Sequence, residues 1–144
     1  MTPTQISLLR ESFAAVTPIA EEAAALFYER LFTLDPGLRP LFAGTDMAAQ
    51  GRKLMQALAY VVGALDAPAN MLAALRSLGE RHAGYGVEER HYATVGQALL
   101  WTLGQGLGAR FTPAMHEAWA AAYAVVSVTM IDAARARPTL RAAA

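Results

Sequence analysis

The sequence contains no cysteine among its 144 residues. Disulfide bonds, thiol catalysis and thiolate metal sites are therefore excluded, because each of them requires a cysteine sulfur. Lysine and arginine together number 12 and are balanced by 12 acidic residues, with no basic block along the chain. A nucleic-acid partner is not indicated, because binding to a phosphate backbone needs a concentration of positive charge.

Long apolar runs are also missing, although 55% of the residues are hydrophobic. No stretch of the roughly 18 apolar residues that would cross a bilayer is free of polar breaks, so we expect no transmembrane helix. Residues 1–5 carry neither the charged segment nor the apolar segment that begins a secretory leader. The expected location is the cytoplasm.

The alternation of apolar and polar residues that marks a β-strand is absent too. Apolar residues instead recur every three to four positions, and alanine and leucine, both strong helix formers, dominate the composition. This pattern predicts one all-α domain over residues 1–138, with a disordered tail at 139–144. Six long or moderate helices and one short helical turn are expected, at about residues 3–16, 18–34, 36–42, 47–65, 69–83, 88–107 and 113–137.

Cap and turn residues separate these helices. Thr2 and Gln5 form the pattern of a capping box at the first helix, and Thr17-Pro18 repeats a helix-start signal. Asp46 is placed to cap the helix that follows it. The segment Gly84-Tyr85-Gly86 is expected to end the helix before it, because glycine stops helices.

Histidine is scarce, with three in the chain, and it is the residue type on which metal and proton-transfer sites most often depend. His116 lies in the first turn of the last helix and is expected on the surface. His91 directly precedes Tyr92 and so points away from that residue's buried face, toward the surface or a helix interface. His82 follows Leu78 by four residues and continues the apolar stripe of its helix.

Two interpretations of His82 are open from the residues alone. Its spacing favours a histidine that is hydrogen-bonded within the core, and a metal ligand is the less frequent alternative. No second histidine, cysteine or close carboxylate pair shares its face, so side chains alone would not complete a zinc site. If His82 binds a metal, a macrocycle would have to supply the remaining ligands, because a haem needs only one bond from the protein.

Several segments, taken in their order, resemble a globin, and in particular the single-domain bacterial haemoglobins and the haem domain of flavohaemoglobins. The resemblance covers about residues 3–136. The segments that carry it are Leu41-Phe42 after a proline, Gln50 with Lys53-Leu54, Arg81-His82-Ala83-Gly84-Tyr85-Gly86-Val87, His91-Tyr92-Ala93-Thr94-Val95-Gly96, and the pair Trp119 and Tyr123. The resemblance implies a globin fold of about six to seven helices wrapped round one haem b (Fe-protoporphyrin IX).

The resemblance also implies roles for individual residues. His82 would be the proximal ligand of the iron, and Phe42 would pack flat on the haem. Tyr28, Gln50 and Leu54 would form the distal side of the pocket, where the tyrosine O–H and the glutamine N–H are donors that stabilise negative charge on a bound ligand. The other residues implied to contact the cofactor are Lys53, Leu58, Leu78, Arg81, Val87, Tyr92, Val95 and Met130. Without the resemblance, Tyr28 would be an ordinary core tyrosine and Gln50 a solvated residue near a helix start.

One departure from the flavohaemoglobin pattern concerns the far nitrogen of the proximal histidine, which in that family is coupled to a tyrosine and a glutamate. Tyr92 fits the tyrosine, but the alignment of the last helix puts Ala134 at the glutamate position. Asp132 lies about 200° round that helix from Ala134 and is not expected to replace the glutamate. We therefore expect His82 to donate to a backbone carbonyl, that of Leu78, which makes the imidazole less electron-donating and disfavours peroxidase-like chemistry.

Four functions are compatible with these features. The leading one is a haem protein for oxygen binding and transport that takes up O2 reversibly and tightly, with NO and CO as further ligands. The second is a nitric oxide dioxygenase for NO detoxification, which would need a separate flavin reductase because no dinucleotide glycine motif is present. The third is a haem-based gas sensor module, and the fourth is an all-α interaction domain without haem. The oligomeric state is not set by any of these features.

Overall fold

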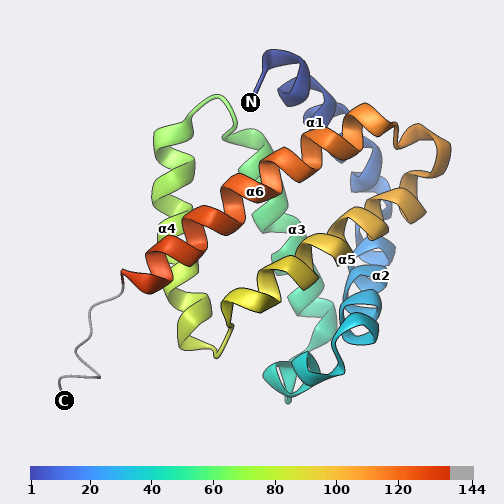
Figure 1. Ribbon diagram of the computed structural model, residues 1–144. Helices are drawn as coiled ribbons and strands as arrows, with labels where there is room; N and C mark the ends of the chain where they lie inside the picture. The colour runs from blue at the N-terminus through green and yellow to red at the C-terminus, as the bar shows by residue number, and fades with distance from the viewer. Residues whose placement is uncertain (137–144) are drawn as a thin grey trace.

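Six α-helices and three short 3-10 helices make up the computed structural model, in which residues 1–136 are described (Figure 1). In chain order they are α1 (Pro3–Val16), η1 (Thr17–Ile19), α2 (Ala20–Leu34), η2 (Pro36–Phe42), α3 (Met47–Gly63), α4 (Pro68–Gly84), α5 (Glu89–Leu107), η3 (Gly108–Arg110) and α6 (Pro113–Arg135). No strand occurs within residues 1–136, so the predicted all-α class is confirmed. The tail predicted at 139–144 lies outside the described residues.

Two helices begin at the caps that the sequence predicts. In α1 the Gln5 N–H donates to the Thr2 hydroxyl, and the Thr2 N–H donates to the Gln5 side chain, each at 3.1 Å. In α3 the Asp46 carboxylate accepts the N–H groups of Ala48 at 3.0 Å and Ala49 at 3.3 Å. These caps satisfy N–H groups that have no partner inside the helix, so each helix start is fixed by residues next to it in the sequence.

The predicted helix start at Thr17 is wrong. Thr17 has helical backbone angles, φ −52° and ψ −42°, whereas an N-cap residue needs an extended backbone. Its hydroxyl donates back to the Phe13 carbonyl at 3.0 Å, and η1 carries the chain into α2. The helix α2 then begins at Ala20 without a side-chain cap, and Glu21 and Glu22 complement the positive end of its dipole.

The helix α4 packs chiefly on α6, whereas α2 packs on α5 and α3. Figure 1 shows α6 crossing the front of the molecule between α4 and α1, with α3 passing behind it. Gly79 allows the close approach of α4 to α6, because a Cβ at this position would clash with the backbone of Met130. The helix that carries His82 is therefore held tightly against α6. Within residues 1–136 no helix is long and apolar enough to span a membrane.

The buried apolar side chains form two separate clusters. The larger cluster joins α1, α2, α3, α5 and α6, and its large rings are those of Phe27, Tyr28, Phe32 and Trp119. The smaller cluster lies beside α4 and consists of Ala64, Met71, Leu75, Tyr92 and Met130. Most of the predicted apolar pocket residues are half-buried, and each packs against one of these two clusters.

Candidate functional site

Tyr28 and Gln50 meet from two helices, α2 and α3. The Gln50 side-chain amide donates to the Tyr28 hydroxyl, with 3.1 Å between Nε2 and Oη. Tyr28 is buried, and its burial raises the pKa of the phenol, while the bond from Gln50 acts in the opposite direction. The phenol is therefore protonated at neutral pH. Because its oxygen accepts the amide N–H, and because no hydrogen bond donated by its O–H is found within residues 1–136, that O–H can donate to a ligand.

Aromatic rings surround Tyr28 and hold its direction. The Phe27 ring meets it edge-on at a centroid distance of 4.9 Å, the Phe42 ring at 5.5 Å, and the Phe32 ring lies tilted at 6.2 Å. Edge-to-face contacts of this kind are favourable because a ring edge is positive and a ring face negative. Sequence reasoning did not assign Phe27 and Phe32 to the site. Their positions along α2 mark them as apolar core residues and do not show that their rings pack against Tyr28.

His82 lies in the last turn of α4 and is half-buried. Its Nδ1 is 2.8 Å from the Leu78 carbonyl oxygen, the partner that the sequence predicts. Because a carbonyl only accepts, Nδ1 carries the proton and Nε2 keeps its lone pair. Burial lowers the pKa of His82; the Leu78 bond opposes this shift, and the Arg81 charge adds to it. His82 is thus a neutral imidazole at neutral pH, the form that binds metal ions.

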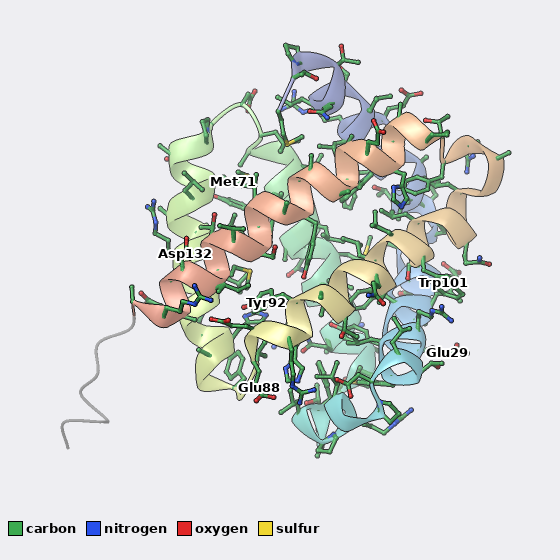
Figure 2. All side chains as sticks on the ribbon, in the orientation of Figure 1. Glu29, Met71, Glu88, Tyr92, Trp101 and Asp132 are labelled. Carbon is green, nitrogen blue, oxygen red and sulfur yellow. The ribbon has the colours of Figure 1, made fainter. Side chains whose placement is uncertain are left out.

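Neither Tyr92 nor the α6 residues Asp132 and Ala134 hydrogen-bonds to the His82 ring within residues 1–136. Tyr92 is buried at the start of α5, and its backbone carbonyl accepts the Tyr123 hydroxyl at 2.6 Å. Asp132 is exposed on α6, and Ala134 offers no polar group (Figure 2). Within the described part of the chain, the hydrogen bond of the His82 ring is to the Leu78 carbonyl and not to a carboxylate.

The loop after α4 is tied to the backbone of His82. The N–H groups of Tyr85 and Val87 both donate to the His82 carbonyl, at 3.0 and 3.1 Å. Gly86 makes this turn possible with a φ of +92°, a value that residues with a side chain rarely adopt. At Gly86 the loop lies against the Leu41 side chain, so it reaches the segment η2 on the Tyr28 side.

The remaining predicted pocket residues fall into three groups. Six apolar ones are half-buried: Phe42, Leu54, Leu58 and Val95 pack on the larger cluster, and Leu78 and Val87 pack on the smaller. Tyr92 and Met130 are buried inside the smaller cluster. Lys53 and Arg81 are exposed, so their charged groups lie outside the apolar part of the site.

These residues fit a haem. A flat, mostly apolar macrocycle needs apolar side chains around it and one ligand for its iron. The six half-buried apolar residues and the lone pair on His82 Nε2 meet these needs. A hollow of about 490 Å³ beside Phe42 is lined by η2, Phe32 and Met47, and neither His82 nor Tyr28 lines it. A metal site made of side chains alone is not supported, because residues 1–136 hold no group of three or more histidine or acidic side chains that could share an ion.

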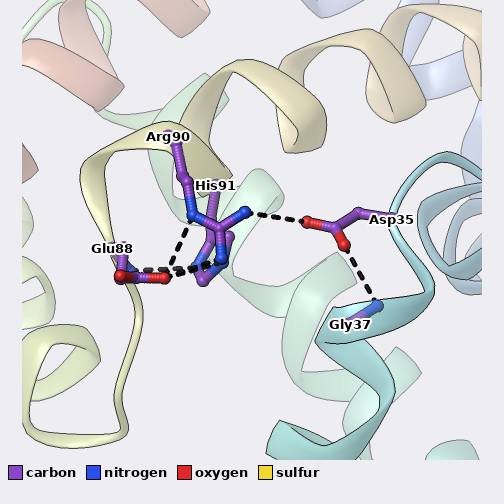
Figure 3. A network of polar contacts seen from close by, with 5 residues as sticks. All are labelled: Asp35, Gly37, Glu88, Arg90 and His91. Carbon is purple, nitrogen blue, oxygen red and sulfur yellow. Dashed lines mark hydrogen bonds and ion pairs between the residues drawn. The ribbon is translucent and has the colours of Figure 1, made fainter.

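The two other histidines differ from each other. His116 is exposed, as the sequence predicts. His91 is 5% exposed, which excludes the surface, one of the two positions predicted for it, and does not contradict the other, a helix interface. Its Nδ1 accepts the Glu88 N–H at 2.9 Å, and its Nε2 lies 3.4 Å from the Glu88 carboxylate (Figure 3). The helical pattern places the ring outside the core, but this hydrogen bond draws it back over the first turn of α5.

Comparison with known proteins gives a consistent result. A model of the globin family matches residues 25–130, well over half of the chain. The chain is 31% identical over 140 residues to a flavohemoprotein of Bordetella pertussis, which covers 94% of the chain and 34% of that protein. It is 27% identical over 134 residues to a flavohemoprotein of Vibrio cholerae, which covers 92% of the chain and 34% of that protein. It is also 27% identical over 128 residues to a flavohemoprotein of Bacillus subtilis, which covers 88% of the chain and 32% of that protein. The chain spans about a third of the length of these curated relatives.

Proposed function

The chain belongs to the globin family, and from this premise we propose that it binds O2 reversibly and tightly at a haem b held by His82. Haem b, when bound, supplies an iron atom that takes up O2, NO or CO. The observation that carries the proposal is the bond from Gln50 to Tyr28, because it leaves a buried, protonated O–H free to donate.

On the proximal side, His82 would hold the iron through Nε2, since Nδ1 is occupied by Leu78. Lys53 and Arg81 are exposed cations and would pair with the haem propionates. The apolar contacts to the haem would come from Phe42, Leu54, Leu58, Leu78, Val87 and Val95, with Tyr92 and Met130 behind them.

On the distal side, Tyr28 would donate its O–H to the ligand and Gln50 would direct it. The Tyr28 O–H would stabilise a ligand that carries partial negative charge, because it is a hydrogen-bond donor. A hydrogen bond to a charged group contributes roughly 1.5–3 kcal/mol, which slows release by about tenfold to 100-fold. Leu54 and the rings around Tyr28 would keep water away and so strengthen this bond.

The Leu78 carbonyl behind His82 favours holding O2 over cleaving it. A carboxylate on the far nitrogen would make the imidazole more basic and more electron-donating, and a neutral carbonyl does so less. The arrangement therefore supports ligand storage or transport more than peroxidase-like chemistry.

A second candidate is nitric oxide dioxygenation, favoured by the likeness to proteins named flavohemoprotein. In this reaction one NO, one O2 and one electron give one nitrate, so an electron donor is needed for repeated turnover. That name indicates a flavin as well as a haem, and the chain spans about a third of those proteins. For this chain the electron would come from a flavin reductase.

Spectroscopy and turnover together test both candidates. The purified protein should show a Soret band and, after reduction, a stable spectrum change with O2 that reverses when O2 is removed. Nitrate should then be measured with NO, O2 and a flavin reductase. Formation of many nitrates per haem would favour the dioxygenase, and a single nitrate per haem would favour O2 binding. Absence of a Soret band after expression with added haem precursor would overturn both.

A further inference from the structure

We propose that His91 is a positioning residue for His82, because it fixes the loop that binds the His82 carbonyl and so sets how the imidazole is presented to the iron. This inference rests on the proposed function, since it assumes a haem at His82. It concerns residues of the chain that neither the metal site nor the distal side includes.

The first step is the hold that His91 has on Glu88. The Glu88 N–H donates to His91 Nδ1 at 2.9 Å, and the His91 N–H donates to the Glu88 carbonyl at 3.0 Å. The imidazole is buried, and its Nε2 faces the Glu88 carboxylate at 3.4 Å. One buried side chain therefore holds the backbone N–H of Glu88 and also lies against its exposed carboxylate.

The second step links Glu88 to the opposite side of the site. Arg90 donates to the Glu88 carboxylate from Nε at 3.1 Å and from Nη2 at 2.9 Å, and its Nη1 lies 3.7 Å from Asp35 (Figure 3). Asp35 caps η2 by accepting the Gly37 N–H at 3.0 Å. Because Arg90 is exposed, these ion pairs contribute little energy, and the buried His91 is the main anchor.

The third step carries the constraint from Glu88 to His82. The peptide group that joins Val87 to Glu88 is planar, so holding the Glu88 N–H also holds the Val87 carbonyl, and only the φ and ψ angles of Val87 lie between this plane and the Val87 N–H. The Val87 N–H donates to the His82 carbonyl at 3.1 Å, and the Tyr85 N–H donates to the same oxygen at 3.0 Å. A rotation of the last turn of α4 about its axis would break these bonds, so the direction of the His82 ring depends on how firmly Glu88 is held.

Three variants of the haem-loaded protein test this chain of contacts. His91→Ala removes the acceptor for the Glu88 N–H. His91→Gln keeps one, because a glutamine three residues after the N-cap reaches back to that N–H in capping boxes. His116→Ala is the matched control, since it removes an exposed histidine from the first turn of another helix.

Two measurements report on the bond between His82 and the iron. The iron–histidine stretching band of the ferrous protein, recorded by resonance Raman, should shift or broaden in His91→Ala. Haem transfer to an excess of an acceptor globin should be about tenfold faster, the effect of one buried hydrogen bond. Both should return to wild-type values in His91→Gln and stay unchanged in His116→Ala. A lower melting temperature in His91→Ala with an unchanged band, or no rescue by glutamine, would overturn the proposal.

A third measurement does not require haem. Hydrogen–deuterium exchange of the Val87 and Glu88 amides, measured before haem is added, should be faster in His91→Ala and normal in His91→Gln. If the wild-type protein takes up no haem while exchange responds as expected, the proposed function fails and the hold of His91 on the loop stands. If exchange at Val87 does not change, the positioning role fails even when haem binds normally.

Discussion

The Tyr28 side and the His82 side of the site are assembled in different ways. On the Tyr28 side, side chains from separate elements converge: the Gln50 amide lies 22 residues away in sequence, and the Phe42 ring comes from η2. On the His82 side, the partners are backbone groups of the same helix and of the loop that follows it, at most five residues away.

This difference has a physical consequence for how each side responds to substitution. A backbone carbonyl such as that of Leu78 is present whatever side chain stands there, so the orientation of His82 tolerates change around it. The Tyr28 hydroxyl depends on a particular side chain at position 50 and on the rings that pack against it. We therefore expect one dominant residue on the His82 side and coupled effects on the Tyr28 side.

Replacing His82 with glycine should give the largest effect, because no other imidazole on that side offers a lone pair. Haem retention should fall at least about 100-fold, more than the roughly 10–100-fold that loss of an outer partner costs a metal site. The Soret absorbance of the purified protein measures this, and added imidazole should restore part of it. His116→Ala should keep the band. A full band in His82→Gly would show that the iron is bound elsewhere.

Replacing Tyr28 with phenylalanine should speed O2 release by about tenfold to 100-fold, because it removes one hydrogen bond to a charged ligand while keeping the ring. Stopped-flow displacement of O2 from the ferrous protein gives the rate. Release of CO, which carries much less charge, is the internal control and should change little. If the O2 rate did not change, Tyr28 would not be the distal donor.

Gln50→Leu should have a smaller effect of a few-fold on O2 release, since Gln50 acts by directing the Tyr28 hydroxyl. In the Tyr28→Phe background the same substitution should add nothing, because the group that it directs is gone. Release rates of the two single variants and the double variant complete this cycle. Strictly additive effects would mean that Gln50 donates to the ligand by itself.

Acid should weaken the haem-free protein slightly through His82. Burial lowers the pKa of its ring below the unfolded value of about 6.5. Between these two values the unfolded chain binds more protons, so the free energy of unfolding rises with pH in this window and falls as the pH drops through it. The melting temperature should therefore fall less between about pH 7 and about pH 5 in His82→Gln than in the wild type. An equal fall in both would contradict the lowered pKa.

Local contacts explain which parts of the fold could be predicted from the sequence. The caps at Thr2 and Asp46 and the bond from His82 to Leu78 join residues at most four apart, and all were predicted. Thr17 also carries a local helix-start signal, but its hydroxyl donates to the Phe13 carbonyl in the preceding turn. For His91, helical periodicity predicts the direction of the Cα–Cβ bond. It does not predict that the imidazole turns back toward the Glu88 N–H.

Contacts between distant residues explain the rest. Without the resemblance to globins, Tyr28 was expected in the core and Gln50 in solvent near a helix start, and only the resemblance paired them. Even then, the direction of the bond, with Gln50 donating to Tyr28, came from the structure. The division of the core into two clusters was likewise not predictable, because it depends on how α4 is placed relative to α6.

The contact between Gly79 and Met130 has a consequence for the order in which the protein is made on the ribosome. The helix α4 has its main partner in α6, which is synthesised later, so α4 cannot dock when His82 first leaves the exit tunnel. The earlier helices α1, α2 and α3 can begin to pack while translation continues. The His82 side is therefore completed after α6 has been translated, and haem held there would be captured after translation. A nascent chain arrested before Met130 should bind haem poorly and leave the apolar residues of α4 open to chaperones.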